Sequence, residues 1–234
     1  EGSTLKVLES VPPLFVDTLS NDLDDPCVEL PDDVCVEWGR YRTVVNLQPS
    51  DQNYTIVYQR CCRNNTIVNI IDPETTGATF FVEITQQGYN ECNSSPTFVN
   101  DGGADANYPP VAICVGKDIV FDHSATDLDG DSLVYSLCTP FEGATFAVPY
   151  PTIPSSPPYD LINWKAPYDL DNLLGGNIDA LAIDPVTGLL TGFPQIQGQF
   201  VVGICVEEYR DNELLSTVRR DFQYNVTMCE ETVA

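Results

Sequence analysis

The chain has 234 residues, and its 35 acidic and 10 basic side chains give a formal net charge of −25 at pH 7. So negative a surface repels the phosphates of nucleic acids and anionic membranes, and it attracts cations. Calcium, which prefers several oxygen ligands, is the cation that we expect, although the acidity could instead serve only to keep an exposed protein soluble.

Short β-strands are the elements that the sequence predicts. Its 18 prolines and 15 glycines interrupt the chain, and no long stretch has the period of an amphipathic helix. In the N-terminal half, apolar and polar residues alternate over 43–47 and 54–58, and 78–84 is a further β-rich run. Short strands separated by turn residues are typical of a β-sandwich.

A stretch of Gly, Pro and acidic residues at 100–110, NDGGADANYPP, separates two strand-rich regions of similar size. We therefore expect two domains, 1–107 and 108–234, with the boundary in this linker. The expected fold class is all-β, with two tandem Ig-like β-sandwich modules, long loops and little helix. The first module could lack its first strands. No apolar run is long enough to span a membrane.

The second region ends in a long predicted hairpin. Earlier strands are expected at 111–115, 119–122 and 132–138. Apolar residues then alternate along 200–206 and again along 218–228, and the sequence YRDNE between these runs supplies the turn.

A loop at 149–168 places aromatic residues among prolines that would hold them rigid. If these side chains are exposed, they could stack on sugar rings or dock into a neighbouring subunit. If they are buried, they cap one end of the sandwich. The four residues are Tyr150, Tyr159, Trp164 and Tyr168.

The cysteines are dispersed through β-like segments. They include no C-x-x-C pair and the chain has a single histidine, so a zinc or iron–sulfur site is poorly supported. Dispersed cysteines in an acidic chain indicate an oxidising compartment and structural disulfides, and their odd number leaves one thiol free or paired outside the chain. The nine are Cys27, Cys35, Cys61, Cys62, Cys92, Cys114, Cys138, Cys205 and Cys229.

Connectivity cannot be deduced from sequence alone, but four pairings are plausible. Cys114 with Cys229 would join terminal strands of the second module, and Cys138 with Cys205 would lock its interior. In the first module, the expected pairs are Cys27 with Cys35, and Cys92 with either Cys61 or Cys62, which leaves the other member of that adjacent pair unpaired.

The segment DLDGD places three carboxylates, those of Asp127, Asp129 and Asp131, at alternate positions around a glycine. One loop could thus point several oxygens at a hard cation, or the same residues could simply form a turn. An EF-hand is excluded, because Cys138 stands where that loop requires a glutamate. Further ligands could come from Asp122, Asp101 and Asp105 at the domain junction.

Two segments carry a resemblance to known modules. LAIDPVTGLLTGFPQIQGQFVVGICVEEYRD, at 181–211, resembles Ig-like modules of bacterial surface proteins, and SATDLDGDSLVYSL, at 124–137, is similar to the opening of cadherin-like modules. With VCVEWGRYRTVVNL, YQRCCRNNTIVNI and RRDFQYNVTMC, they look like gliding-motility-associated, type IX secreted multi-domain surface proteins of Bacteroidetes. The resemblance covers about 25–229 and implies location and architecture more than activity.

The expected function is structural: an extracellular stalk, adhesin or filament at the bacterial cell surface, with partners that are further copies or neighbouring modules. The alternative is an adhesive module that binds carbohydrate, such as surface glycans, through loop 149–168. An enzyme is not expected, because no nucleophile elbow, phosphate loop or H-E-x-x-H motif occurs. Asp122, His123 and Ser124 are adjacent on a predicted strand and cannot form a catalytic relay.

Overall fold

The computed structural model describes residues 10–18, 37–99, 112–176 and 181–229. Within these ranges the chain is nearly all β with one short helix, which confirms the expected fold class at this level. The elements are β1 (Pro13–Thr18), β2 (Glu37–Tyr41), β3 (Tyr54–Arg60), β4 (Ala78–Ile84), α1 (Gln86–Asn90), β5 (Thr97–Phe98), β6 (Ala112–Cys114), β7 (Ile119–Asp122), β8 (Ala125–Thr126), β9 (Ser132–Leu137), β10 (Ala182–Ile183), β11 (Leu189–Gly192), β12 (Gly198–Arg210) and β13 (Glu213–Thr227).

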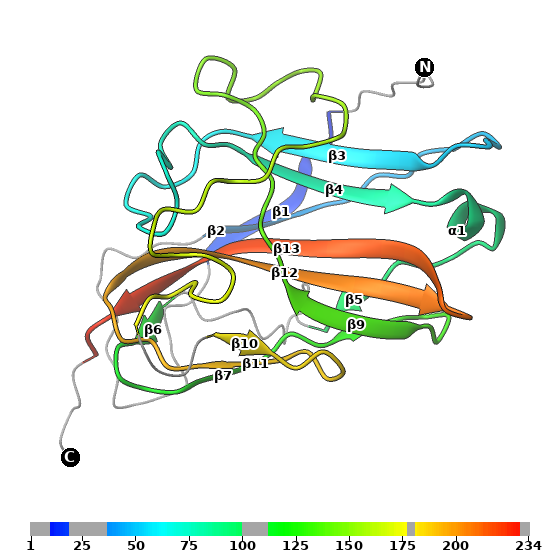
Figure 1. The fold of residues 1–234 in the computed structure, drawn as a ribbon. Helices are drawn as coiled ribbons and strands as arrows, with labels where there is room; N and C mark the ends of the chain where they lie inside the picture. The colour runs from blue at the N-terminus through cyan, green and yellow to red at the C-terminus, as the bar shows by residue number, and fades with distance from the viewer. Residues whose placement is uncertain (1–9, 19–36, 100–111, 177–180, 230–234) are drawn as a thin grey trace.

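The C-terminal half forms a β-sandwich of two small sheets (Figure 1). One sheet has the order β6-β13-β12-β9, in which β6 runs parallel to β13 and the other pairs are antiparallel, and the second has the order β10-β11-β7. Buried side chains from both sheets, including Ile119, Leu190, Phe200 and Val202, meet in the main core.

The predicted C-terminal hairpin is confirmed. Strands β12 and β13 pair from Gly198 opposite Val226 to Arg210 opposite Glu213. The turn residues Asp211 and Asn212 have φ angles of 51° and 66°. Asp and Asn tolerate this left-handed region better than other residues with side chains, which explains their place in a tight hairpin turn.

Strand β12 is buried on both faces. Phe200, Val202, Ile204 and Val206 point into the main core. Val201, which points to the opposite face, belongs to a second cluster with Ile67, Ile70 and Ile162. A segment of the N-terminal half therefore covers the outer face of the C-terminal sheet.

The side chain of Asn69 ties this segment to β12. It is completely buried, its Oδ1 accepts the N–H of Val201 at 2.9 Å, and its Nδ2 donates to the C=O of Val201 at 2.9 Å and of Leu173 at 3.1 Å. Strand β9 pairs with β12 only at 204–209, so this edge of Val201 has no strand neighbour. The amide of Asn69 replaces the missing strand at this point.

Two further contacts join the halves of the chain. Arg63 forms a bidentate ion pair with Asp221 of β13 at 2.9 and 2.6 Å, and both side chains are about nine-tenths buried. Strand β5 pairs with β8, which brings Phe98 into the main core. Two tandem sandwiches with separate cores are thus not confirmed, and the expected boundary falls in 100–111, outside the described residues.

Two disulfides crosslink the C-terminal sandwich. Cys114 at the end of β6 is bonded to Cys229, and Cys138 after β9 is bonded to Cys205 of β12, with Cα–Cα distances of 5.4 and 5.9 Å. These are the two pairs expected for this half. Cys27 and Cys35 lie outside the described residues.

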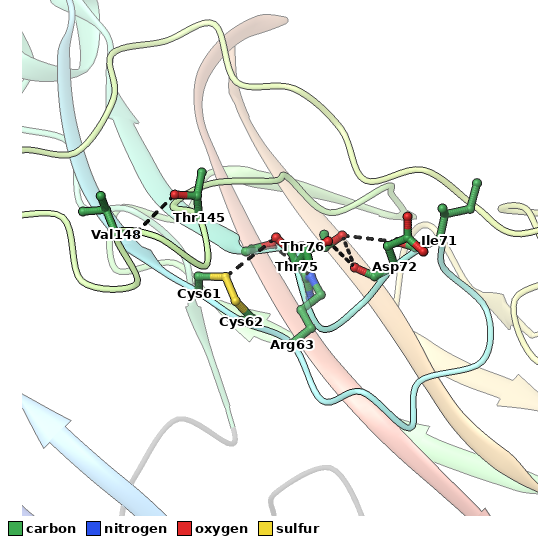
Figure 2. The surroundings of a disulfide bond; sticks show 10 residues. Cys61, Cys62, Arg63, Ile71, Asp72, Thr75, Thr76, Thr145 and Val148 are labelled. Atoms are coloured by element: carbon green, nitrogen blue, oxygen red, sulfur yellow. Dashed lines mark hydrogen bonds between the residues drawn. A yellow bond between two sulfur atoms is a disulfide. The ribbon is translucent and has the colours of Figure 1, made fainter.

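The expectation for the remaining cysteines was wrong, because Cys61 is bonded to Cys62 (Figure 2). Neither of them is therefore paired with Cys92. Cys92 is exposed and has no disulfide partner among the described residues. Its neighbours Glu91 and Asn93 bind Arg210 at the turn end of the hairpin.

The Cys61–Cys62 pair lies near the middle of the hairpin. This position follows from the next residue, Arg63, which binds Asp221 there. Asp221 lies opposite Gly203, seven residues from Arg210 along β12. Along β12, the position near Arg63 and the position near Cys92 are thus about 20 Å apart. Within the described ranges, no helix has the length and apolar character needed to cross a membrane.

We expect Asn69→Leu to lower the free energy of unfolding by roughly 2–4 kcal/mol, because leucine leaves both the N–H and the C=O of Val201 buried without a partner. Urea unfolding followed by circular dichroism measures the change. Asn65→Leu, four residues earlier and exposed, is the matched control. A loss of stability no larger than that of the control would contradict the bridging role of Asn69.

Candidate metal centre

The DLDGD loop joins β8 to β9 and is folded by its own first aspartate. Asp127 Oδ1 accepts the backbone N–H of Asp129 at 3.0 Å and of Asp131 at 2.9 Å. Gly130 has a φ of 83°, a left-handed conformation that favours glycine. The predicted turn and a cluster of carboxylates therefore coexist in one loop.

The structure brings three of the six predicted metal ligands together. Oxygens of Asp127, Asp129 and Asp131 lie within 4.8 Å of one another, so this cluster could hold a metal ion. Asp122 is outside the cluster: it is exposed at the end of β7, and its Oδ1 accepts the N–H of Ser124 at 2.8 Å. Asp101 and Asp105 lie outside the described residues.

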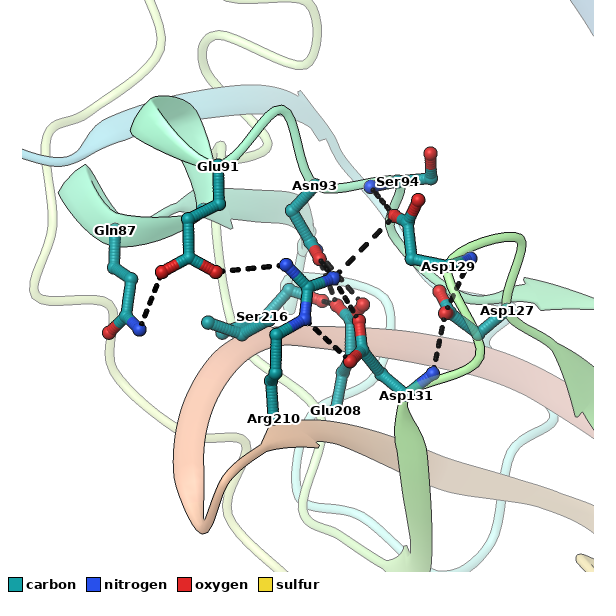
Figure 3. A network of polar contacts seen from close by, with 12 residues as sticks. Gln87, Glu91, Asn93, Ser94, Asp127, Asp129, Asp131, Glu208, Arg210 and Ser216 are labelled. Atoms are coloured by element: carbon teal, nitrogen blue, oxygen red, sulfur yellow. Dashed lines mark hydrogen bonds and ion pairs between the residues drawn. The ribbon is translucent and has the colours of Figure 1, made fainter.

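Arg210, the last residue of β12, already supplies one positive charge to the cluster (Figure 3). Its Nε and Nη2 donate to the two oxygens of Asp131 at 2.7 and 2.5 Å, and its Nη1 donates to Glu91 at 2.9 Å. Nη2 also lies 3.8 Å from Asp129. Hydrogen bonding to Arg210 lowers the pKa of Asp131, and the same pairing raises the pKa of Arg210.

Glu208 lies beneath this ion pair and is completely buried. Both of its carboxylate oxygens accept from Asn93 Nδ2 at 2.9 Å, and one also accepts from the Ser216 hydroxyl. Burial raises the pKa of Glu208 from 4.5 to about 7; hydrogen bonds from Ser216 and Asn93 oppose this rise, and the charge of Asp127 adds to it.

The cluster is short of positive charge. Among the described residues, five carboxylates gather here with one guanidinium, that of Arg210: Glu91, Asp127, Asp129, Asp131 and Glu208. The second oxygen of Asp127 is enclosed and accepts no hydrogen bond. A carboxylate oxygen removed from water without a partner is costly, so a proton or a cation at this position would stabilise the folded state.

Sequence reasoning missed Glu208, Arg210 and the residues that follow α1. A signal for Glu208 was present in the sequence. It continues the series of every second residue that faces the core from β12, after Phe200, Val202, Ile204 and Val206. A carboxylate at a core-facing position indicates a buried polar site.

Three of the four aromatic side chains singled out in loop 149–168 pack inward. Trp164 contacts both core clusters and donates from its indole nitrogen to Thr139 at 3.2 Å, while Tyr168 makes an edge contact with Phe200. Tyr159 packs on two phenylalanines, and burial raises the pKa of its hydroxyl. Tyr150 is 64% exposed, with the guanidinium of Arg60 over its ring.

The single histidine is enclosed in the core. His123 is 0% exposed, and burial, aided by the charge of Arg220, lowers its pKa to about 3. Its Nδ1 lies 3.2 Å from Arg220 Nη1 and must accept, because the guanidinium can only donate. The neutral ring therefore carries its proton on Nε2, which is buried without a hydrogen-bond partner.

No protein family, curated protein or solved structure matches the chain. The geometry of the described residues is therefore the basis for the function proposed below.

We expect Glu208→Gln to flatten the pH dependence of stability in EDTA. The pKa of Glu208 is raised in the folded chain, so its contribution to stability is fully present below pH 4.5 and is lost as pH rises through about 7. Glutamine keeps the shape without the charge, so the stability of the variant should exceed that of the wild type increasingly from pH 5 to pH 8.

Urea unfolding at a series of pH values measures this difference. Glu207→Gln, at the neighbouring half-buried residue, is the control and should follow the wild type. Parallel pH profiles for Glu208→Gln and the wild type would show that burial does not raise the pKa of Glu208.

Proposed function

We propose that the chain is an extracellular structural protein of the bacterial surface, a disulfide-stapled β-sandwich unit of a stalk, adhesin or filament that binds calcium and associates with further copies. The observation that carries the proposal is the pair of long-range disulfides that crosslink the four-stranded sheet β6-β13-β12-β9, called the central sheet below. They close sequence separations of 115 and 67 residues. Such crosslinks persist in oxidising compartments, and they limit the unfolded chain most when the loop is long.

The position of these crosslinks suits a unit that bears load. One disulfide fastens the segment after β13 to β6, and the other fastens the segment after β9 to β12. Two of the four strands of this sheet, β6 and β12, are thus each joined covalently to the segment that follows a neighbouring strand. A force applied near the C-terminal end of this sheet meets covalent bonds as well as hydrogen bonds.

An exposed apolar ribbon supports self-association. Strands β1 and β2 pair with each other, and all six residues of β1 are exposed. Leu14, Phe15 and Val16 are 61%, 41% and 52% exposed. An isolated two-stranded ribbon is marginally stable in water, and exposed apolar patches mark interaction surfaces. A second copy that covers this ribbon would stabilise it.

Calcium fits the donor set of the cluster. Asp127, Asp129 and Asp131 offer only carboxylate oxygens, the ligand type that hard cations prefer, and no cysteine or histidine belongs to the cluster. Soft transition metals are therefore disfavoured at this position. Bound calcium would also offset part of the self-repulsion of a chain with a net charge of −25.

Electron microscopy and sedimentation of the purified protein test this function. In calcium we expect ordered assemblies, and chelation with EDTA should loosen them. Val16→Glu on the ribbon should prevent assembly, because it places a charge in the proposed contact, whereas Val186→Glu, at a turn residue that is 78% exposed, should not. Dispersed monomers of the wild type with and without calcium would overturn the structural proposal.

A further inference from the structure

We propose that Glu208 is a ligand of the same divalent cation, so that strand β12 completes the site that the DLDGD loop begins. This inference rests on the function proposed above, because it deepens the calcium site assigned there to Asp127, Asp129 and Asp131. It turns a surface loop site into one shared between the loop and the central sheet.

The loop alone offers few oxygens to a hard cation, and most of them already accept hydrogen bonds. Both oxygens of Asp131 are held by the guanidinium of Arg210, and Asp127 Oδ1 is used by two backbone N–H groups. Asp129 Oδ2 accepts the N–H of Ser94 at 2.6 Å. A hard cation that requires several oxygens would therefore need a further carboxylate close by.

Glu208 is the carboxylate that lies within reach. It projects from β12 toward the loop (Figure 3), and its carboxyl group lies so close to those of Asp127 and Asp131 that the pKa values of Glu208 and Asp131 are affected. Its side chain is completely enclosed, so water cannot solvate its charge. Asn93 and Ser216 orient it from two sides, as outer hydrogen bonds orient metal ligands.

An independent observation points to an ion between these groups. Asp127 Oδ2 is buried, has no hydrogen-bond partner, and belongs to the carboxylate that lies beside Glu208. Two carboxylates that lie side by side, one of them completely buried, repel each other unless a proton or a cation is shared between them. Arg210 does not supply that charge, because its three nitrogens bond to Asp131, Glu91 and Asn93.

Calcium titration of the whole chain by isothermal calorimetry tests the inference. We expect the wild type to bind one calcium ion, and Glu208→Gln to weaken binding on the order of tenfold or more. Glu207→Gln is the matched control, since its carboxylate accepts from Tyr209 and not from the cluster, and it should bind calcium as the wild type does. Asp127→Asn tests the loop itself and should weaken binding at least as much.

The outcomes separate the two levels of the proposal. If Glu208→Gln binds calcium as tightly as the wild type while Asp127→Asn does not, the loop holds the ion alone and the role of Glu208 is overturned. If the wild type binds no calcium, the calcium site itself is overturned.

A folding defect would not leave the question open. Circular dichroism checks that Glu208→Gln is folded, and Glu208→Asp keeps the charge on a shorter side chain if it is not. The shorter carboxylate of that variant would sit too far back to ligate well, so its affinity should fall between those of the wild type and the glutamine variant. Wild-type affinity in a folded Glu208→Asp would contradict direct ligation.

Discussion

The burial of β12 on both faces is the constraint on which the rest of the structure depends. Its inward face needs the sheet formed by β7, β10 and β11, and its outward face needs the apolar residues around Ile67 and Ile70. An apolar strand that is open to water on one side would be costly, so the N-terminal half is required as a cover. The side chain of Asn69 and the Arg63–Asp221 ion pair fix that cover in register.

The same strand explains the candidate metal centre. Side chains on one face of a strand recur at every second residue, so the core-facing row from Phe200 continues to Glu208. A carboxylate at the end of a core-facing row cannot reach bulk water. The amide of Asn93, the hydroxyl of Ser216 and the acidic loop therefore gather around it, and the end of the core becomes a polar site.

Local chemistry was predictable from the sequence, and the assembly of segments was not. The hairpin and its Asp-Asn turn follow from alternation and turn residues in one stretch of chain. The two disulfides of the C-terminal half were only plausible pairings, suggested by the positions of their cysteines in the predicted strands. The prediction of two separate modules overlooked the second face of β12. Val201, Gly203 and Cys205 make that face apolar too, and a strand that is apolar on both faces is expected to be buried on both. Glu91 and Asn93 contact Arg210 although they lie 119 and 117 residues away in the sequence, so no local sequence pattern predicts these contacts.

Basic residues are scarce in this chain, and the structure uses two of them where separate segments meet. Arg63 pairs with Asp221 between the covering segment and β13, and Arg210 joins the region after α1 to the acidic loop and β12. Salt screens exposed carboxylates, but it acts weakly on enclosed ones. The excess negative charge of the molecule is thus most costly around Asp127 and Glu208, and a divalent cation there would stabilise the joint between the loop, the hairpin and the core more than a counterion elsewhere on the surface.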